Sequence, residues 1–341
     1  MALSKIEVPS LDVGQLGSRN VVMNGNFEVN QRSVSSYTGL TGFNRGPDRW
    51  MWAKNDTVNF DAVYGTFSNT FTDIPEARGF MEFTLNSAGS GTDFVTIQQR
   101  IEDVRVCAGE EVTLTFWARS NTGSSFTLTE AASISHGPIA VQQIFGSGGS
   151  GAVNHVVASS ITLNTAWTKY SYTFTMPSVS GKTLGTSHHT RLYLCTMMDS
   201  DAGKGVQIAQ VQMERGKATP FEHENYGTTL QKCQRYFEKS YNQAVSPGTL
   251  TNDGMVMFIS NRNPGSPHMG LRFIATKRAP PSVVVYNPVE TANTLRNLDA
   301  GGVSYNSTVN RIGATGCTVY TATSVSLGNF MCYHYTADAE L

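Results

Sequence analysis

The sequence predicts an all-β protein, and three features support this fold class. Apolar residues occur at every second position along many short segments, which is the period of a strand with one buried face. Residues that favour turns separate these segments at short intervals. Charged residues make up 15% of the 341 positions, well below the ~25% that is usual for soluble domains. Gly, Ser, Thr and Asn fill these places, as is typical of a chain with many turns.

Residues 21–226 are predicted to form a β-sandwich. Segments with clear alternation lie at 81–85, 95–97, 112–118, 170–176 and 192–194. Turn-forming residues separate them, at 108–109, 121–123, 146–151, 180–181 and 201–203. No helical stripe interrupts this part of the chain, so we expect about eight antiparallel strands in two sheets.

The segment 206–213 changes the phase of its alternation. Val206 and Ile208 share one parity, whereas Ala209, Val211 and Met213 share the other. A period-2 pattern that slips by one residue and then continues indicates a β-bulge or a strand that changes sheets. We therefore expect an irregular strand that closes the sandwich.

Residues 227–341 are predicted to form a smaller β-domain with one short α-helix. Thr228 and Gln231 fit a capping box at the start of a helix over 228–241. An apolar stripe at helical spacing supports this helix, and its members are Leu230, Cys233, Phe237 and Tyr241. Strands are expected at 255–259, 271–275, 282–286, 317–320 and 330–336. About 115 residues are enough for a small core of their own.

Charge and cysteine usage exclude several classes of function. The net charge is −1 and no cluster of Lys or Arg occurs, so we expect no nucleic-acid binding through a basic patch. No apolar run suits a signal peptide or a membrane span, so we expect synthesis in a cytoplasm and no membrane insertion. The five cysteines are widely spaced and match no zinc-ligand pattern. We expect them to be buried free thiols.

The sequence has no pattern that predicts catalysis. It contains neither the G-x-S-x-G turn of a serine hydrolase nor the H-E-x-x-H of a metallopeptidase. His188 and His189 are adjacent, so on a strand they would point to opposite faces. Glycoside hydrolysis needs two carboxylates at a set separation, which a sequence does not reveal. We therefore predict a protein that is not an enzyme, with no catalytic residues, no metal and no cofactor.

Motifs spread along most of the chain resemble those of bacteriophage tail-fibre and minor structural proteins with a jelly-roll module. In chain order, the matching residues are Asn24–Glu28, Gln31–Arg32, Asp48–Trp50, Ala209, Val211, Gln212, Glu214, Gly216, Ala218–Glu222, Cys233–Phe237 and Ala337–Leu341. Segments 108–118 and 167–175 also resemble carbohydrate-binding jelly rolls of the galactose-binding-like kind. The resemblance implies a protein of the virion, and fibre proteins of this kind are commonly homotrimers.

The resemblance is compatible with three alternative functions, which we rank by preference. The first is a tail fibre or fibre-like adhesin that binds a host-surface glycan. The alternative is a capsid or tail decoration protein that binds only virion partners. The third is a glycan depolymerase, which is disfavoured because no long repetitive β-helix pattern or catalytic motif appears. Residues 1–20 are apolar yet too short for a domain, and the family has a short leading arm. We therefore expect this arm to attach the protein to other virion proteins.

Two regions are candidates for the glycan site. Loops expected at 261–269 and 287–302 are rich in residues that form surface turns and offer amides and hydroxyls to a sugar. The candidate residues there are Asn261, Arg262, Asn263, His268 and Asn287. In the jelly roll, Trp50 and Trp52 share one face of a predicted strand and could form a stacking platform, although such a pair is more often core.

Glu28 matches the position at which similar carbohydrate-binding jelly rolls place a structural calcium ligand. Their second acidic ligand corresponds to Gln210 here, whereas calcium prefers several hard oxygens with net negative charge. We therefore expect no calcium, and we expect Glu28 to pair with an arginine such as Arg32 or to cap a turn.

Overall fold

The computed structural model describes residues 19–39, 44–54, 58–68, 74–87, 93–130, 137–260, 267–289, 293–299 and 301–341. The chain divides into two compact units. The sandwich unit comprises the described residues of Met1–Phe27, Ser36–Arg45 and Trp50–Glu224. The C-terminal unit comprises those of Glu28–Ser35, Gly46–Arg49 and Asn225–Leu341. Two short segments of the predicted jelly roll therefore belong to the C-terminal unit.

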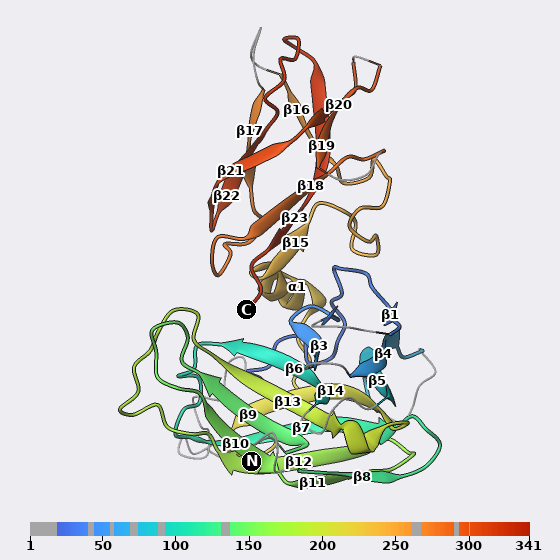
Figure 1. Cartoon of the computed structure of the whole chain (residues 1–341), viewed down its shortest axis with the longest axis vertical. Coiled ribbons are helices and arrows are strands. Elements are labelled where there is room, and N and C mark those ends of the chain that lie inside the picture. Colours follow the sequence, from blue (N-terminus) through green and yellow to red (C-terminus); the bar gives the residue numbers. More distant parts are fainter. Residues whose placement is uncertain are drawn as a thin grey trace, which may run out of the picture. The chain divides into compact units, whose positions relative to one another are not determined.

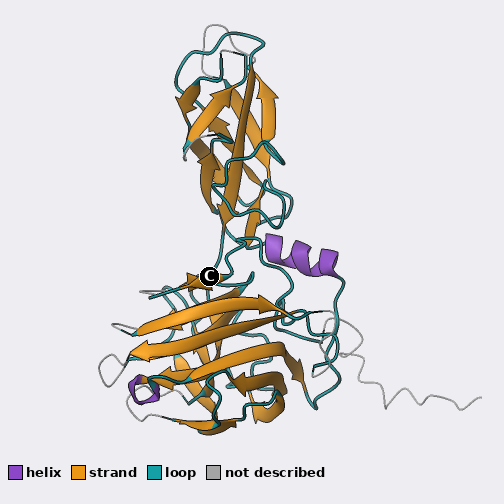
Figure 2. Ribbon diagram, turned by 90° about the vertical axis from the view of Figure 1, so that its right-hand side faces the viewer, coloured by secondary structure: helices purple, strands orange, loops and turns teal. Residues whose placement is uncertain are grey.

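The sandwich unit consists of two antiparallel sheets in a jelly-roll β-sandwich, as the sequence predicts (Figures 1 and 2). The first sheet has the order β1 (Ser36–Tyr37), β4 (Asn59–Thr66), β5 (Gly79–Ser87), β14 (Gly205–Arg215), β7 (Glu111–Ser120) and β12 (Thr168–Thr175). The second has the order β10 (Val153–Ala158), β9 (Ile139–Ile144), β13 (His189–Met198), β6 (Phe94–Glu102), β3 (Trp50–Lys54) and β2 (Asn44–Arg45). β8 (Phe126–Thr129) pairs with β11 (Ser160–Leu163), and a 3-10 turn spans Asp199–Asp201.

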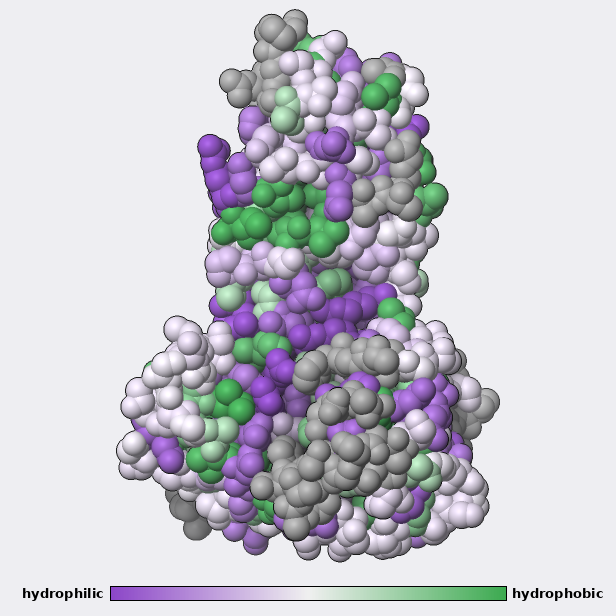
Figure 3. Space-filling view, viewed as in Figure 1, coloured by the Kyte–Doolittle hydropathy of each residue, from purple (hydrophilic) through white to green (hydrophobic). Residues whose placement is uncertain are grey.

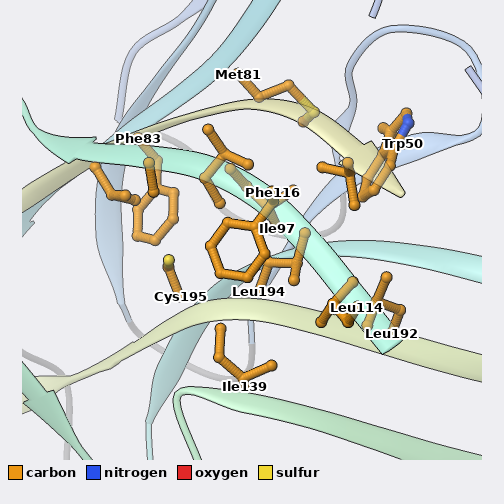
Figure 4. Close-up of a cluster of buried hydrophobic side chains, with 14 of the residues drawn as sticks. Trp50, Met81, Phe83, Ile97, Leu114, Phe116, Ile139, Leu192, Leu194 and Cys195 are labelled. Atoms are coloured by element: carbon orange, nitrogen blue, oxygen red, sulfur yellow. The ribbon is translucent and has the colours of Figure 1, made fainter. Parts of the chain in front are cut away.

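The core of the sandwich unit lies between its two sheets. Leu114 and Phe116 point inward from β7, and Ile97 and Leu194 point inward from the other sheet (Figure 4). All four side chains are completely buried. Since every second residue of each strand faces this layer, the alternation seen in the sequence supplies the apolar surface that holds the sheets together.

The predicted irregularity in segment 206–213 is confirmed as a β-bulge in β14. Its register against β7 shifts between Ala209 and Gln212, and Gln210 adopts a positive φ of 44°. The extra residue resets the parity of the strand. As a result, Ile208 before the bulge and Val211 after it both join the sandwich core.

The C-terminal unit is built around its last strand, β23 (Phe330–Asp338). This strand pairs with β15 (Phe237–Lys239), β16 (Val256–Ile259), β18 (Ser282–Tyr286) and β19 (Thr294–Asn297), and β19 pairs with β20 (Ser304–Asn306). A further sheet has the order β17 (His268–Arg272), β22 (Gly316–Tyr320) and β21 (Thr308–Gly313). The sequence predicted β18 with the same bounds, but it did not reveal β15, β19, β20 or β21.

The predicted helix over 228–241 is wrong in both its start and its end. The helix α1 spans Tyr226–Gln234, and its N-cap is Asn225, whose side chain accepts a hydrogen bond from the backbone N–H of Gly227. Phe237 lies instead in β15, opposite Asp338 of β23. Pairing with β23 thus replaces the last turns of the predicted helix, because a tertiary partner outweighs weak helix propensity. Phe237 and Tyr241 are nevertheless buried.

Three remaining features concern the thiols, the membrane and the N-terminal arm. The five cysteines are buried and free, as predicted. Within the described ranges, no helix is long and apolar enough to cross a membrane. The predicted arm, residues 1–20, lies outside the described residues except for Arg19 and Asn20.

Candidate functional site

A pocket of about 520 Å³ lies within the C-terminal unit. Its lining comprises Arg32, Val34, Phe237, Ser246, Pro247, Ser282, Val284, Tyr286, Thr336 and Asp338. The volume falls in the range of sites for small molecules. The lining combines two aromatic rings and aliphatic groups with hydroxyls and one ion pair, so both apolar and polar ligand surfaces have partners there.

The floor of the pocket is one face of the strands β15, β23 and β18. Asp338 lies between Phe237 and Ser282 in the strand register. The next position on the same face of β23 is Thr336, which lies opposite Val284. Residues two apart on a strand share a face, so this register alone brings the floor together. The opposite face of the same strands contributes to the core of the unit.

The walls of the pocket come from distant parts of the chain. Arg32 and Val34 belong to segment 28–35, and Ser246 and Pro247 belong to the loop after β15. The buried ammonium group of Lys239 joins these two walls. It donates hydrogen bonds to the Ser33 hydroxyl (3.3 Å) and to the carbonyl oxygens of Gln243 (2.9 Å) and Val245 (2.6 Å). Burial lowers the pKa of Lys239 to about 8.

An ion pair between Arg32 and Asp338 lies at one side of the pocket. Arg32 Nη2 donates to Asp338 Oδ2 at 2.9 Å, and the backbone N–H of Glu340 donates to Asp338 Oδ1 at 2.9 Å. The Arg32 guanidinium also stacks over the Phe237 ring at 3.8 Å. Burial opposes the positive charge of Arg32, but Glu340 and two aspartates outweigh it and raise the pKa of this guanidinium. The Arg32 side chain is 11% exposed and that of Asp338 is 40% exposed.

A buried hydrogen-bond network supports the Arg32 segment from behind. The backbone N–H of Gln31 donates to Asp48 Oδ1 at 2.9 Å, and its side-chain amide donates to Asp48 and to the Phe237 carbonyl. Burial raises the pKa of Asp48 to about 6, although the charge of Arg32 opposes this shift. Arg49 forms a buried ion pair with Glu340. These bonds fix segments 28–35 and 46–49 to the C-terminal unit.

The surface of the C-terminal unit is chemically mixed. In the space-filling view, hydrophilic groups surround a hydrophobic patch in the region of β18, β21 and β22 (Figure 3). Among the described residues, no three His, Cys, Asp or Glu side chains gather into a possible metal site.

Of the glycan-binding residues predicted from the C-terminal loops, the structure describes His268 and Asn287, and neither lines this pocket. Asn261, Arg262 and Asn263 lie outside the described residues. His268 is in β17, where its ring stacks on Tyr320 at 4.6 Å. Asn287 is 1% exposed, and its amide donates to the hydroxyls of Thr294 and Ser304. The prediction of a surface role for Asn287 is therefore wrong, because β19 occupies part of the expected loop.

The alternative platform of Trp50 and Trp52 is also wrong. Both side chains are completely buried and face the sandwich core. Their indole N–H groups donate to the carbonyl oxygens of Asn24 and Glu82 at 3.0 Å. A sugar ring needs an exposed aromatic face, which neither residue offers. The core interpretation of this pair is the correct one.

Composition and periodicity did not identify the pocket residues, but the motifs of the resemblance include two of its charged residues. Arg32 and Asp338 both belong to motifs on which the resemblance rests, yet they are 306 positions apart. Arg32, one of the partners expected for Glu28, forms an ion pair with Asp338. The charged residues within these short motifs were the feature that could have drawn attention to this site.

A second polar surface lies on the outer face of β13, β6 and β9. Arg191 lies directly opposite Arg100 on β6 and Gln142 on β9. Gln142 Oε1 accepts hydrogen bonds from Arg191 (3.2 Å) and from the hydroxyl of Tyr193 (2.9 Å). The centre of this face is closed, because Tyr193 and Gln98 are each 2% exposed. The pocket of the C-terminal unit is therefore the stronger candidate for ligand binding.

Comparison with known proteins finds similarity in fold only. No family model and no curated protein matches the chain. The structure is similar to the enzymatically active domain of tailspike protein 4 of bacteriophage CBA120, with 16% identity and a TM-score of 0.33 over 58% of this chain and 22% of that chain. It is similar to a family 11 carbohydrate-binding module from Clostridium thermocellum, with 13% identity and a TM-score of 0.31 over 56% of this chain and 99% of that one.

A cyclase from Fischerella sp. TAU matches at the same level, with 17% identity and a TM-score of 0.32 over 57% of this chain and 96% of that one. Since fold does not determine function, a functional assignment depends on the residues of the pocket.

Proposed function

We propose that this protein is a non-enzymatic virion protein, a tail fibre or fibre-like adhesin, and that its C-terminal pocket binds a host-surface glycan. One observation carries the proposal: the exposed carboxylate of Asp338 lies in a pocket that Tyr286 and aliphatic groups also line. A sugar has apolar C–H faces and hydroxyl edges. Tyr286, Val284 and Pro247 suit the first, and Asp338 with the neighbouring hydroxyls suits the second.

A binding role is favoured over hydrolysis by the number of carboxylates in the pocket. Asp338 is the carboxylate in its lining, and Glu340 nearby is 1% exposed and paired with Arg49. Glycoside hydrolysis by the common mechanisms requires two carboxyl groups on either side of the scissile bond. We therefore place the depolymerase function behind the adhesin function.

A glycan array tests the proposed function directly. Full-length protein should bind a defined subset of glycans, and Tyr286→Ala should weaken that binding at least about tenfold, as expected for an aromatic contact at the centre of a site. Tyr305→Ala is the matched control, since Tyr305 lies in the same unit outside the pocket. Absence of binding to any glycan, together with normal assembly into virions, would favour the decoration protein instead.

Attachment to the virion is the second part of the proposal. Residues 1–20 would bind other virion proteins, and the assembled form would be a homotrimer. Deleting residues 2–19 should leave glycan binding unchanged and prevent incorporation into particles. Normal incorporation of the deletion variant would move the attachment site to another part of the chain.

A further inference from the structure

The charges around the pocket specify the kind of sugar that fits. Arg32 is the cation in the lining, but its guanidinium is enclosed between the Phe237 ring at 3.8 Å and Asp338 at 2.9 Å. Glu340 lies 3.8 Å from its other nitrogen, Nη1. With two carboxylates around it and 11% of its side chain exposed, Arg32 offers little positive charge to a ligand.

Asp338 is the charged group that a ligand would meet. Its side chain is 40% exposed, nearly four times the fraction of Arg32. Its two oxygens each accept one hydrogen bond, from Arg32 Nη2 and from the backbone N–H of Glu340. A carboxylate has about four acceptor positions, so Asp338 can accept further bonds from ligand hydroxyls. A ligand carboxylate, sulfate or phosphate would instead be repelled.

The other polar groups of the lining are neutral. Ser246, Ser282 and Thr336 contribute hydroxyls that can donate or accept. Lys239 lies behind the walls, and its ammonium hydrogens are directed to Ser33, Gln243 and Val245. Its charge therefore stabilises the walls and does not neutralise an acidic ligand in the pocket.

We infer that the pocket selects an uncharged sugar, a neutral hexose or an N-acetylhexosamine, and discriminates against uronic and sialic acids. This inference rests on the proposed glycan-binding function and specifies its ligand class. Asp338 is the specificity-determining residue, because it accepts hydroxyl hydrogens from a neutral sugar and repels an acidic one. Arg32 acts as a positioning residue that holds Asp338 in place.

The test is calorimetric titration of the full-length protein with two sets of sugars. The neutral set is the methyl glycosides of glucose, galactose and mannose with N-acetylglucosamine, and the acidic set is glucuronic acid and N-acetylneuraminic acid. At least one neutral sugar should bind, and neither acidic sugar should bind comparably. Asp338→Asn should weaken the neutral sugar about tenfold or more, the effect of losing charge-assisted hydrogen bonds.

A second variant guards against a folding defect in Asp338→Asn. Ser282 is exposed and lies opposite Asp338 in the register, so Ser282→Lys should pair with Asp338, weaken the neutral sugar and increase binding of the acidic ones. Ser326→Lys, at an exposed position outside the lining, should change neither. Melting temperatures of all variants provide the control for folding.

The outcomes separate the inference from the function on which it rests. Preference of the wild type for the acidic sugars, with loss of binding in Tyr286→Ala, would overturn the neutral-sugar inference and leave the glycan-binding function intact. If a neutral sugar binds and its affinity is unchanged by Asp338→Asn, Ser282→Lys and Tyr286→Ala, the pocket is not the binding site. That result would overturn both the proposed function of the pocket and the neutral-sugar inference. No binding of either set, with no signal on a glycan array, would overturn both proposals.

Discussion

The two units of this protein differ in what their interiors contain. The sandwich unit encloses a large apolar layer that includes Trp50, Phe83 and Phe116. The C-terminal unit has a smaller apolar cluster and buries ion pairs beside it. Lys277 and Glu238 form a pair at 2.7 Å with both side chains at 0% exposure, and Arg49 pairs with Glu340 at 2% and 1%.

The two kinds of interior respond differently to pH and to substitution. An apolar layer depends on shape and area, so it responds little to pH. Buried ion pairs are favourable only when both partners are present, because each charge has lost its hydration. The C-terminal unit is therefore sensitive to the loss of any single charged partner.

Among the tests of this difference between the units, a matched pair of Phe→Ala substitutions should have the largest effect on stability. Phe116 in the sandwich unit is 0% exposed and Phe237 in the C-terminal unit is 4% exposed. Each substitution should destabilise its own unit by ~3–5 kcal/mol, the range for a buried aromatic. Calorimetry should show two transitions, with a different one lowered in each variant.

Phe330→Ala is the control, since Phe330 is 43% exposed and should change stability by less than about 0.5 kcal/mol. A loss below about 1 kcal/mol for Phe237→Ala would show that this ring contributes little to the unit. One common transition lowered by both substitutions would mean that the units unfold as a single body.

Breaking the buried ion pair should have the next largest effect. Glu238 accepts hydrogen bonds from Lys277 (2.7 Å) and from the Tyr335 hydroxyl (2.8 Å). Glu238→Gln should destabilise the C-terminal unit by about 3 kcal/mol, because the Lys277 ammonium would stay buried without its counter-charge. Glu110→Gln removes a half-exposed partner of Arg215 and should have an effect below about 1 kcal/mol. If urea denaturation shows that Glu238→Gln and Glu110→Gln lower the free energy of unfolding equally, burial does not make the Lys277–Glu238 pair more sensitive than an exposed pair.

The two units should also differ in the pH dependence of their stability, but by less than in their responses to the Phe→Ala and Glu238→Gln substitutions. Burial raises the pKa of Asp48 to about 6 from its ordinary value of 3.8. Between these two pH values the folded state binds more protons than the unfolded state, so stability falls as pH rises from about 4 to about 6. A shift of about two pKa units corresponds to about 3 kcal/mol across this window.

Asp48→Asn should remove this slope from the transition of the C-terminal unit and leave the sandwich transition unchanged. The difference in melting temperature between wild type and variant, measured from pH 4 to pH 6.5, isolates Asp48 from other titrating groups. Parallel curves for the two proteins would mean that Asp48 ionises normally in the folded state.

Truncation at residue 226 should have the smallest effect on the sandwich. The fragment 21–226 should be soluble and give a β-rich circular dichroism spectrum, because the apolar layer belongs to the sandwich unit. Segments 28–35 and 46–49 would lose their partners in the C-terminal unit, so limited proteolysis should cut there first. A fragment that aggregates, or that is cut first inside β7 or β14, would show that the sandwich does not fold alone.

Much of the fold follows from local patterns in the sequence. The alternation at 112–118 placed β7 close to its observed bounds, and the strand predicted at 282–286 coincides with β18. The phase slip after Ile208 located the bulge in β14. Local patterns failed for the helix, which ends at Gln234 because the following residues pair with β23. They also failed for β15, which lies within the predicted helix, and for β19, β20 and β21, which are partly exposed.

The all-β class follows from the sequence alone, because period-2 alternation depends only on neighbouring residues and one buried face. The lack of a Lys/Arg cluster along the chain and the spacing of the cysteines can also be read from the sequence. The pocket, in contrast, depends on the tertiary structure. Arg32, Tyr286 and Asp338 meet through the register of β23 with its neighbours and through the hydrogen bonds of Gln31 and Lys239. Such pairings between distant segments depend on complementary partners, which no local period records.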